Sequence, residues 1–275
     1  MMKKLTALLL AILMLATLCC SCGKDDKTLT VATSTGFEPF EMVNNGLYSG
    51  IDMEIAAGLA EYLGKDLKIE DMQFESVVTS VEQKQCDIGM AGLTITPARE
   101  KVVTFSDPYN SANQVLVFPA SNTEFDNCKT KEDVVAILNA KTADCKIGCQ
   151  KGTTGSIYIT GDSDNPDGYG FTGLTATKME YDYAALAFTA MINGSIDYVI
   201  VDNAPANAIA KANDGKVKVI DIPLSEESYA FCVSKEDPEL LKKVNEYLKQ
   251  IKEDGTFDKI CNNYFGDGTP AEIKG

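Results

Sequence analysis

The chain has 275 residues, 45% of them hydrophobic and 24% charged, which is a soluble globular profile with enough length for one large domain or two ordinary ones. The formal net charge is −15, and so acidic a surface repels nucleic acid and anionic lipid head groups, so we expect no nucleic-acid partner. The sequence contains no histidine, which excludes Ser-His-Asp and Cys-His nucleophile systems, a histidine general base and histidine metal sites.

The N-terminus has the pattern of an export signal. A basic start is followed by an apolar run over residues 5–18, which is too short to span a membrane comfortably. The cysteine-rich end of this run resembles a bacterial lipoprotein cleavage site, with Cys22 as the lipidated residue and Cys20 as the weaker candidate. We therefore expect residues 1–21 to be a signal peptide and residues 22–27 to be a tether to the outer face of the cell membrane.

Strands and helices alternate in the first part of the chain. The predicted elements are a strand at 28–32, a helix at 51–63 ended by Gly64, a strand at 67–69, a helix at 76–85 and a strand at 87–90. This order predicts a parallel sheet with right-handed crossovers. Ligands bind beyond the carboxyl ends of such strands, where the loops at 34–38 and 91–96 belong.

A second unit of similar design follows. The predicted elements are strands at 114–119, 145–149, 178–181 and 194–203, a helix at 183–192, a last strand at 229–233, and helices at 238–254 and 255–265. Asp87 and Asp197 each precede a buried strand that comes after a helix, so the two halves repeat one plan. The sequence therefore predicts an α/β protein with two units.

Arg99 occupies an unusual place for a cation. Thr96 is a good N-cap and Pro97 suits the first helical position, so Arg99 falls in the first turn of a helix, where the helix dipole is already positive. An anion held bidentately by the guanidinium would explain this placement, and a carboxylate is the simplest such anion. The alternative is a surface ion pair with an acid such as Glu100 or Asp107.

Four further features have both a functional and a structural interpretation. The loop Gly152-Thr-Thr-Gly155 can cradle an anion but lacks the P-loop ending, and it is also a normal threonine-capped helix start. Asp202 ends a buried strand and is either a ligand or an N-cap. Phe37 and Phe74 line a site or belong to the core and its rim.

Six cysteines lie outside the signal region: Cys86, Cys128, Cys145, Cys149, Cys232 and Cys261. None has CxxC spacing, so we expect no metal site and interpret several of them as small buried hydrophobes. Disulfides are compatible with export, and Cys128 with Cys145 or Cys149 is the first pairing to consider.

Several short motifs occur together and in order: Phe37-Glu-Pro-Phe40, Gly50-Ile-Asp-Met-Glu54, Cys86-Asp-Ile-Gly-Met-Ala-Gly-Leu-Thr-Ile-Thr-Pro-Ala-Arg99, Phe105-Ser-Asp-Pro-Tyr109, Gly148-Cys-Gln-Lys-Gly-Thr-Thr-Gly155, Val201-Asp-Asn203, Lys252-Glu-Asp-Gly-Thr-Phe-Asp-Lys259 and Tyr264-Phe-Gly266. By this series, residues 28–266 resemble the polar amino-acid solute-binding proteins of ABC importers, the family 3 type of periplasmic binding protein. Each motif is common, but the ordered series is highly specific.

The resemblance implies eight ligand-binding residues: Phe37, Phe74, Gly92, Thr94, Arg99, Thr153, Thr154 and Asp202. Arg99 would clamp the α-carboxylate, helped by Thr94 and by the backbone and hydroxyls of the two threonines in the glycine loop. Asp202 would take the α-ammonium with Gly92 or Thr94, and the two phenylalanines would sandwich the side chain. A zwitterion needs one fixed cation and one fixed anion, which agrees with this assignment.

The resemblance also implies the architecture and the role. Two lobes, 28–111 with 229–275 and 112–228, would each have a mostly parallel central sheet flanked by helices, and would close on the ligand about two hinge crossings. The protein would be a monomeric extracytoplasmic lipoprotein, without cofactor or metal and not an enzyme. It would capture a polar amino acid in the inter-lobe cleft and deliver it to an ABC permease.

Two other functions remain open on the same scaffold. One is a cyclic-amino-acid dehydratase, for which Glu38, Glu41 and Tyr183 are the candidate acids and bases. The other is a ligand-sensing receptor module. The preferred amino acid also stays open, because Ser34 and Ala91 depart from common family residues while Glu38 and Glu41 could form a negative wall.

Overall fold

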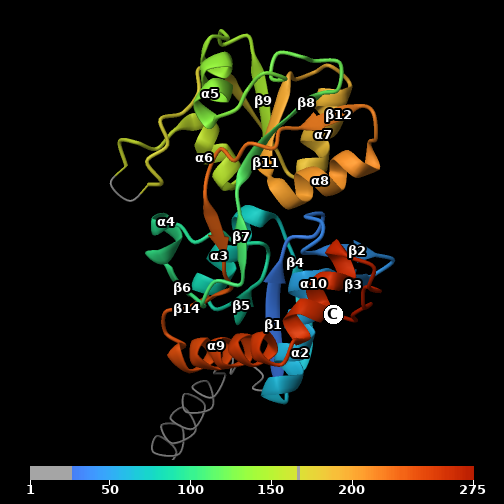
Figure 1. Cartoon of the computed structure of the whole chain (residues 1–275). Helices are drawn as coiled ribbons and strands as arrows, with labels where there is room; N and C mark the ends of the chain where they lie inside the picture. The colour runs from blue at the N-terminus through green and yellow to red at the C-terminus, as the bar shows by residue number, and fades with distance from the viewer. Residues whose placement is uncertain (1–26, 166–167) are drawn as a thin grey trace, which may run out of the picture.

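The computed structural model describes residues 27–165 and 168–275. Two five-stranded sheets, each flanked by helices, form two lobes that lie one above the other (Figure 1). This arrangement confirms the two-lobed α/β class. The expected signal peptide, the lipidated Cys22 and all but the last residue of the tether lie outside the described residues.

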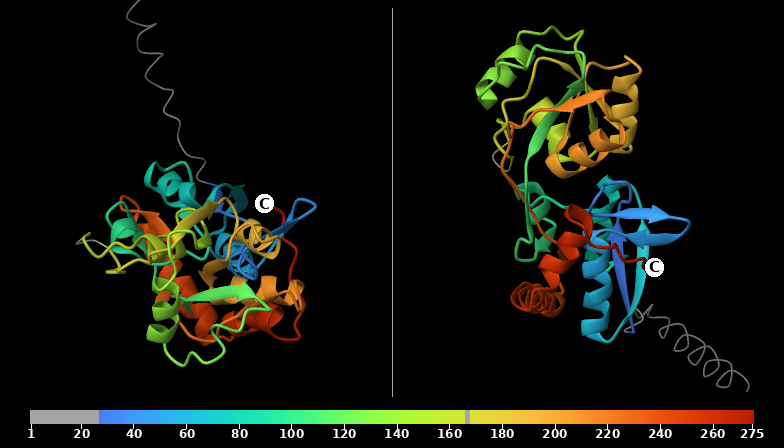
Figure 2. Two further views of the ribbon diagram at one scale, coloured as in Figure 1. Left: turned by 90° about the horizontal axis from the view of Figure 1, so that it is seen from above. Right: turned by 45° about the vertical axis from the view of Figure 1, so that its right-hand side comes forward.

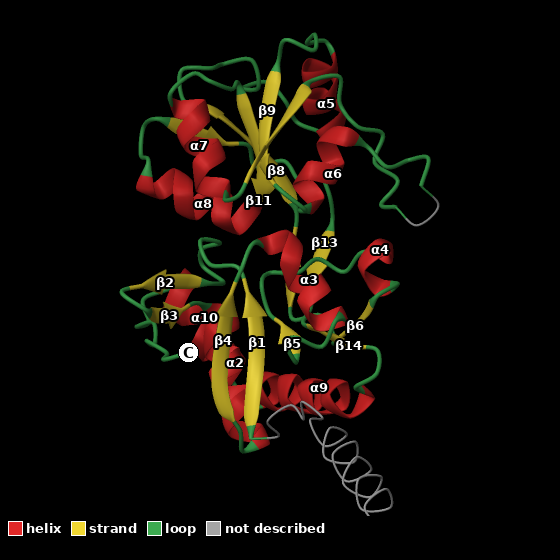
Figure 3. Ribbon diagram, turned by 180° about the vertical axis from the view of Figure 1, so that it is seen from behind, coloured by secondary structure: helices red, strands yellow, loops and turns green. Residues whose placement is uncertain are grey.

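Lobe 1 is built around a mixed sheet of order β4-β1-β5-β14-β6. Its strands are β1 (Thr28–Thr33), β4 (Asp66–Asp71), β5 (Ile88–Gly89), β6 (Val103–Phe105) and β14 (Cys232–Ser234), with a hairpin of β2 (Met42–Asn44) and β3 (Leu47–Ser49). Its helices are α2 (Ile51–Leu63), α3 (Phe74–Glu82), α4 (Pro97–Glu100), α9 (Pro238–Glu253) and α10 (Thr256–Phe265). β1 runs parallel to β4 and β5, and the carboxyl ends of β1 and β4 point towards lobe 2 (Figure 3).

Lobe 2 has a sheet of order β10-β9-β11-β8-β12. Its elements are β8 (Gln114–Pro119), α5 (Lys131–Asn139), β9 (Lys146–Gln150), α6 (Thr154–Thr160), β10 (Thr177–Tyr181), α7 (Ala184–Ile192), β11 (Tyr198–Asp202), α8 (Asn203–Ala212) and β12 (Val217–Val219). Neighbouring residues of β8 and β11 point to opposite faces, so Leu116 and Ile200 join one apolar cluster and Val115 and Val201 join the other. Helices on both faces cover these clusters, as expected for an α/β sheet.

Two short strands connect the lobes. β7 (Asn110–Ala112) and β13 (Glu227–Tyr229) pair antiparallel, and both connections run along one edge of the molecule (Figure 2). The predicted crossing points, residues 111 and 229, lie in these strands. The prediction of a single strand at 229–233 is wrong. The chain pairs with β7 up to Tyr229, and it pairs with β5 and β6 only from Cys232 onwards.

The cysteines are all thiols in the described structure. The six outside the signal region are free, so the disulfide considered from the sequence is not formed. Cys145 and Cys149 are buried in the apolar core of lobe 2, and burial raises the pKa of Cys149 to about 12. These residues serve as small hydrophobes. Within residues 27–165 and 168–275, no helix combines the length and apolar character that crossing a membrane requires.

Candidate functional site

Arg99 lies between the two lobes. The backbone N–H of Arg99 donates a hydrogen bond to the hydroxyl of Thr96 at 3.1 Å. This bond confirms the predicted cap and places Arg99 in the first turn of α4. Its Nη1 donates to the carbonyl oxygen of Thr94 at 2.7 Å, and its Nη2 donates across the lobes to the carbonyl oxygen of Gly152 at 3.1 Å. The guanidinium carbon lies 5.2 Å from the centre of the Phe74 ring.

The guanidinium of Arg99 has no carboxylate partner in the described part of the chain. The surface ion pair with Glu100 or Asp107 is therefore not formed. Burial lowers the pKa of Arg99 from its ordinary value, an effect that nearby Glu227 and Asp202 oppose. Its bonds to two carbonyl oxygens leave other N–H groups for an anion. Arg99 is thus a half-buried cation with no counter-ion in direct contact within the described residues.

The glycine loop after β9 faces lobe 1. Thr153 is the N-cap of α6, accepting from the Ser156 N–H and donating to the Gln150 carbonyl oxygen at 2.8 Å. Gly152 has a φ of 72°, and a Cβ there would lie 3.0 Å from the Cβ of Glu75 in lobe 1. The lobes therefore approach each other as closely as a glycine allows.

The hydroxyls of Thr94 and Thr154 share one acceptor. Both donate to Oε2 of Glu227 at 2.7 Å, although Thr94 belongs to lobe 1 and Thr154 to lobe 2. A threonine hydroxyl has a single hydrogen, so these two side chains offer a ligand their oxygen lone pairs. These two hydroxyls therefore have no hydrogen left to donate to the α-carboxylate of a ligand. The predicted donors would instead be other groups, such as the backbone N–H groups of the glycine loop.

Asp202 ends β11 and begins α8. Its side chain makes no capping bond, and Oδ1 instead accepts from the Tyr229 hydroxyl at 2.6 Å. Burial raises the pKa of Asp202, as does the charge of Glu227, while the hydrogen bond from Tyr229 lowers it. The N-cap interpretation therefore does not account for this side chain, which faces the hinge strand.

Gly92 is held in place by a residue that sequence reasoning missed. The Gly92 N–H donates to Oδ2 of Asp52 at 2.9 Å, and the Tyr109 hydroxyl donates to Oδ1 of the same carboxylate at 2.6 Å. Gly92 has a φ of 53°, and a Cβ there would lie 2.8 Å from Cε1 of Phe37. Asp52 thus shapes the turn over which Phe37 lies. A signal was present, since an acid on the buried face of an apolar helix needs a partner.

The two predicted aromatic residues have different surroundings. Phe37 follows β1 and packs 6.1 Å from Phe40 and 6.4 Å from Tyr229, measured between ring centres. Phe74 begins α3 and lies beside Arg99. Both are buried side chains of lobe 1. Their core interpretation and their ligand-binding interpretation are both compatible with this placement.

Glu41 is the least satisfied group near the site. It is fully buried, and neither carboxylate oxygen has a partner within the described residues. The hydroxyl oxygens of Thr33 and Ser34 in lobe 1 and Oε1 of Gln114 in lobe 2 are also buried without a partner. Burial raises the pKa of Glu41 well above its ordinary value, and the charges of Asp52 and Asp202 raise it further. Buried acceptors in this number favour a ligand that brings donors.

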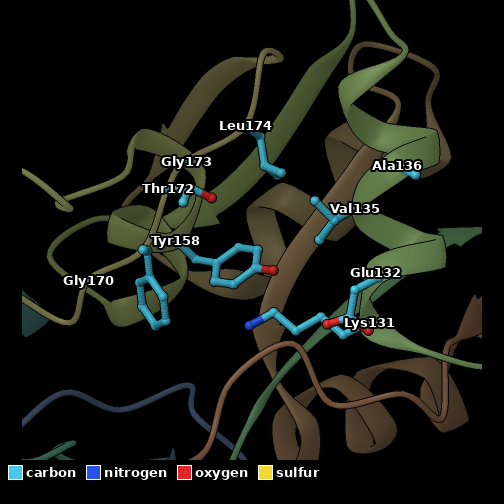
Figure 4. Close-up of a pocket in the computed structure, with 10 residues that line it drawn as sticks. Lys131, Glu132, Val135, Ala136, Tyr158, Gly170, Thr172, Gly173 and Leu174 are labelled. Carbon is cyan, nitrogen blue, oxygen red and sulfur yellow. The ribbon is translucent and has the colours of Figure 1, made fainter.

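A separate pocket lies within lobe 2. It has a volume of about 360 Å³ and is formed by α5, Tyr158 and the chain at 170–174 (Figure 4). Lys131 approaches the Tyr158 ring to 5.4 Å there. None of the eight predicted residues lines this pocket, so it is not the predicted site.

Comparison with known proteins identifies the family. The model of the bacterial extracellular solute-binding proteins, family 3, matches residues 29–267. The chain belongs to this family. The match confirms the family predicted from the ordered motifs, and solute binding is the role that its description carries.

Relatives of this family 3 solute-binding protein are similar over most of their length. The arginine-binding extracellular protein ArtP of Bacillus subtilis is 28% identical over 87% of the chain and 86% of its own length. The crystal structure of a mutant of ArgBP from T. maritima is 35% identical, with a TM-score of 0.72 over 87% of the chain and 95% of its own. The ancestral amino acid-binding protein AncCDT-1, a precursor of cyclohexadienyl dehydratase, is 33% identical, with a TM-score of 0.74 over 87% and 96%.

Proposed function

We propose that this family 3 solute-binding protein captures an amino acid with a cationic side chain between its lobes and presents it to an ABC permease. The lobes are taken as residues 28–111 with 229–275 and residues 112–228. The observation that carries the proposal is the pairing of a half-buried cation, Arg99, with buried carboxylates, none of which has an oppositely charged partner among residues 27–165 and 168–275. The protein is a binding protein in this proposal, as its named relatives are.

The zwitterionic part of the ligand is assigned to charged residues of different lobes. Arg99 of lobe 1 takes the α-carboxylate through its remaining N–H groups, and Asp202 of lobe 2 takes the α-ammonium. Hydrogen bonds to charged partners contribute roughly 1.5–3 kcal/mol each, enough for micromolar binding after the entropy of association is subtracted. Gly92, Phe37 and Phe74 form the wall on the side of lobe 1.

The side chain of the ligand is assigned to the unpartnered acceptors. Glu41 presents carboxylate oxygens, whereas Ser34 and Thr33 present hydroxyls that can accept or donate, so a ligand without donors leaves the Glu41 carboxylate buried and unsatisfied. A guanidinium carries five N–H donors and a full charge, and an ammonium carries three. The acceptors therefore favour arginine or lysine over neutral amino acids, which agrees with the names of the arginine-binding relatives.

The location is proposed from the N-terminal sequence. Residues 1–21 would be removed on export, Cys22 would carry the lipid, and residues 22–27 would tether a monomer to the outer face of the membrane. Growth of cells with a radiolabelled fatty acid, followed by recovery of the protein, tests this step. Label that is lost in a Cys22→Ser variant supports the anchor, and equal label in both proteins contradicts it.

A thermal-shift screen with each standard amino acid tests the ligand class, because a ligand stabilises the form that it binds. L-arginine or L-lysine should raise the melting temperature most, and Glu41→Gln should abolish their advantage over L-glutamine. Glu38→Gln is the matched control, since Glu38 carries the same charge on an exposed side chain. A larger shift with neutral amino acids contradicts the cationic assignment. If mass spectrometry shows that a bound amino acid is converted to a product, the dehydratase function is indicated instead.

A further inference from the structure

Glu227 lies in the middle of the connection between the lobes. It belongs to hinge strand β13, where it pairs with Ala112 of β7, and its side chain is buried. Oε2 accepts from the hydroxyls of Thr94 and Thr154, each at 2.7 Å, and Oε1 accepts from the Ser225 hydroxyl at 2.6 Å. One carboxylate oxygen therefore holds a donor from each lobe.

The two donors of Oε2 are anchored at opposite ends of the hinge. On the side of lobe 1, Thr94 forms an antiparallel β-bridge with Tyr229. The backbone N–H of Ile95 donates to the Ser228 carbonyl oxygen at 3.1 Å. On the side of lobe 2, Nε2 of Gln114 donates to the Thr154 hydroxyl at 3.0 Å. A hinge rotation that separates the lobes pulls these donors apart, so Oε2 cannot keep both.

We propose that Glu227 is a positioning residue that latches the lobes together before any ligand enters. Hydrogen bonds to an ionised acceptor are roughly twice as strong as neutral ones, and this pair is shielded from water, so the latch favours the closed arrangement. A ligand enters only the fraction of molecules in which the latch is open. The latch thus slows ligand entry, and it slows release because it also holds the loaded protein closed.

The same carboxylate determines whether the two threonine hydroxyls act as donors or as acceptors towards a ligand. By accepting both threonine hydrogens, Glu227 leaves the hydroxyl oxygens of Thr94 and Thr154 as acceptors, and the oxygen of Thr154 already accepts from Gln114. This matches an ammonium group better than a carboxylate. The latch itself concerns closing, so it does not depend on which amino acid the protein prefers.

Small-angle X-ray scattering of the ligand-free protein tests the latch directly. Glu227→Leu removes the acceptor and should increase the radius of gyration relative to wild type. Glu227→Gln keeps one neutral oxygen for the two threonines and should give an intermediate value. Thr154→Val leaves the carboxylate in place and removes the lobe 2 donor to Oε2, together with the acceptor of Gln114 Nε2, so it should open the protein even if the leucine variant fails to fold. Thr160→Val, in the same helix but bonded to the Ser156 carbonyl oxygen, is the control and should match wild type.

Stopped-flow tyrosine fluorescence with L-arginine as the probe measures the rate constants of ligand binding and release. A merely structural role of Glu227 would not change these rate constants. Both the association and the dissociation rate constants should rise in Glu227→Leu and Thr154→Val, and the association rate constant should rise by about tenfold if the ligand-free open fraction rises tenfold. Unchanged ligand-free dimensions in both variants would overturn the latch. If L-arginine does not bind, the proposed ligand class fails, whereas the scattering result still decides on the latch.

Discussion

Arg99 and Gly152 are joined across the two lobes, with Nη2 of the arginine 3.1 Å from the carbonyl oxygen of the glycine. One guanidinium thus both bridges the lobes and keeps N–H groups free for a ligand. The contact depends on the missing side chain of Gly152, because any Cβ there would press against Glu75. Closing and carboxylate binding are therefore linked through the same pair of residues.

Replacing Arg99 by alanine should weaken L-arginine binding by roughly 100-fold or more, because two charge-assisted hydrogen bonds are lost. Arg99→Lys should recover only part of this loss, since an ammonium lacks the planar fork. Isothermal titration calorimetry measures the affinities, and the melting temperature without ligand serves as the folding control. An affinity equal to wild type in the alanine variant would remove Arg99 from the site.

Replacing Gly152 by alanine should hinder closing. The new Cβ would lie 3.0 Å from the Cβ of Glu75, so the affinity for L-arginine should fall by about tenfold. The control is Gly194→Ala, because Gly194 has a φ of 73° in the same lobe and no atom within 4 Å of an added Cβ. Both variants should lose about 1 kcal/mol of stability to backbone strain. Equal affinities in the two variants would show that the contact with Glu75 does not limit closing.

The affinity should depend on pH through Asp202. Burial and the charge of Glu227 raise the pKa of this carboxyl, and only its ionised form attracts an α-ammonium. Affinity for L-arginine should therefore fall between about pH 8 and about pH 5. Tyr229→Phe removes the hydrogen bond that lowers the pKa of Asp202, so its affinity should begin to fall at a higher pH. Calorimetric titrations that are flat over this range in both proteins would contradict the role of Asp202.

The stability should depend on pH through Asp52. Burial raises the pKa of Asp52 from an ordinary value near 3.8 to about 7, so the folded state holds a proton that the unfolded state releases. Its contribution to stability is then complete below about pH 4 and is lost as the pH rises to about 7, by at most roughly 4 kcal/mol. Urea unfolding of wild type and Asp52→Asn should show the difference between them changing across this window. Parallel profiles would mean that Asp52 does not titrate there.

Local interactions explain what was predictable from the chain. The end of α2 at Gly64, with a φ of 65°, and the cap of α4 by Thr96 follow from contacts among residues a few positions apart. The order of strands and helices predicted the two sheets, because each element shows its periodicity in its own residues. The ordered motifs identify the family because each of them can be recognised in a short stretch of the chain.

The sequence by itself determined the α/β class, the family and a short set of candidate residues that includes Arg99 and Asp202. Only the tertiary structure decided that Glu227 joins both lobes, that Glu41 is buried without a partner among the described residues, and that the six described cysteines are thiols. The reason is distance along the chain: Thr94 and Glu227 are 133 positions apart, and such a pair leaves no periodic or local signal. Burial, which sets the pKa values of the buried acids, likewise arises only when distant segments pack together.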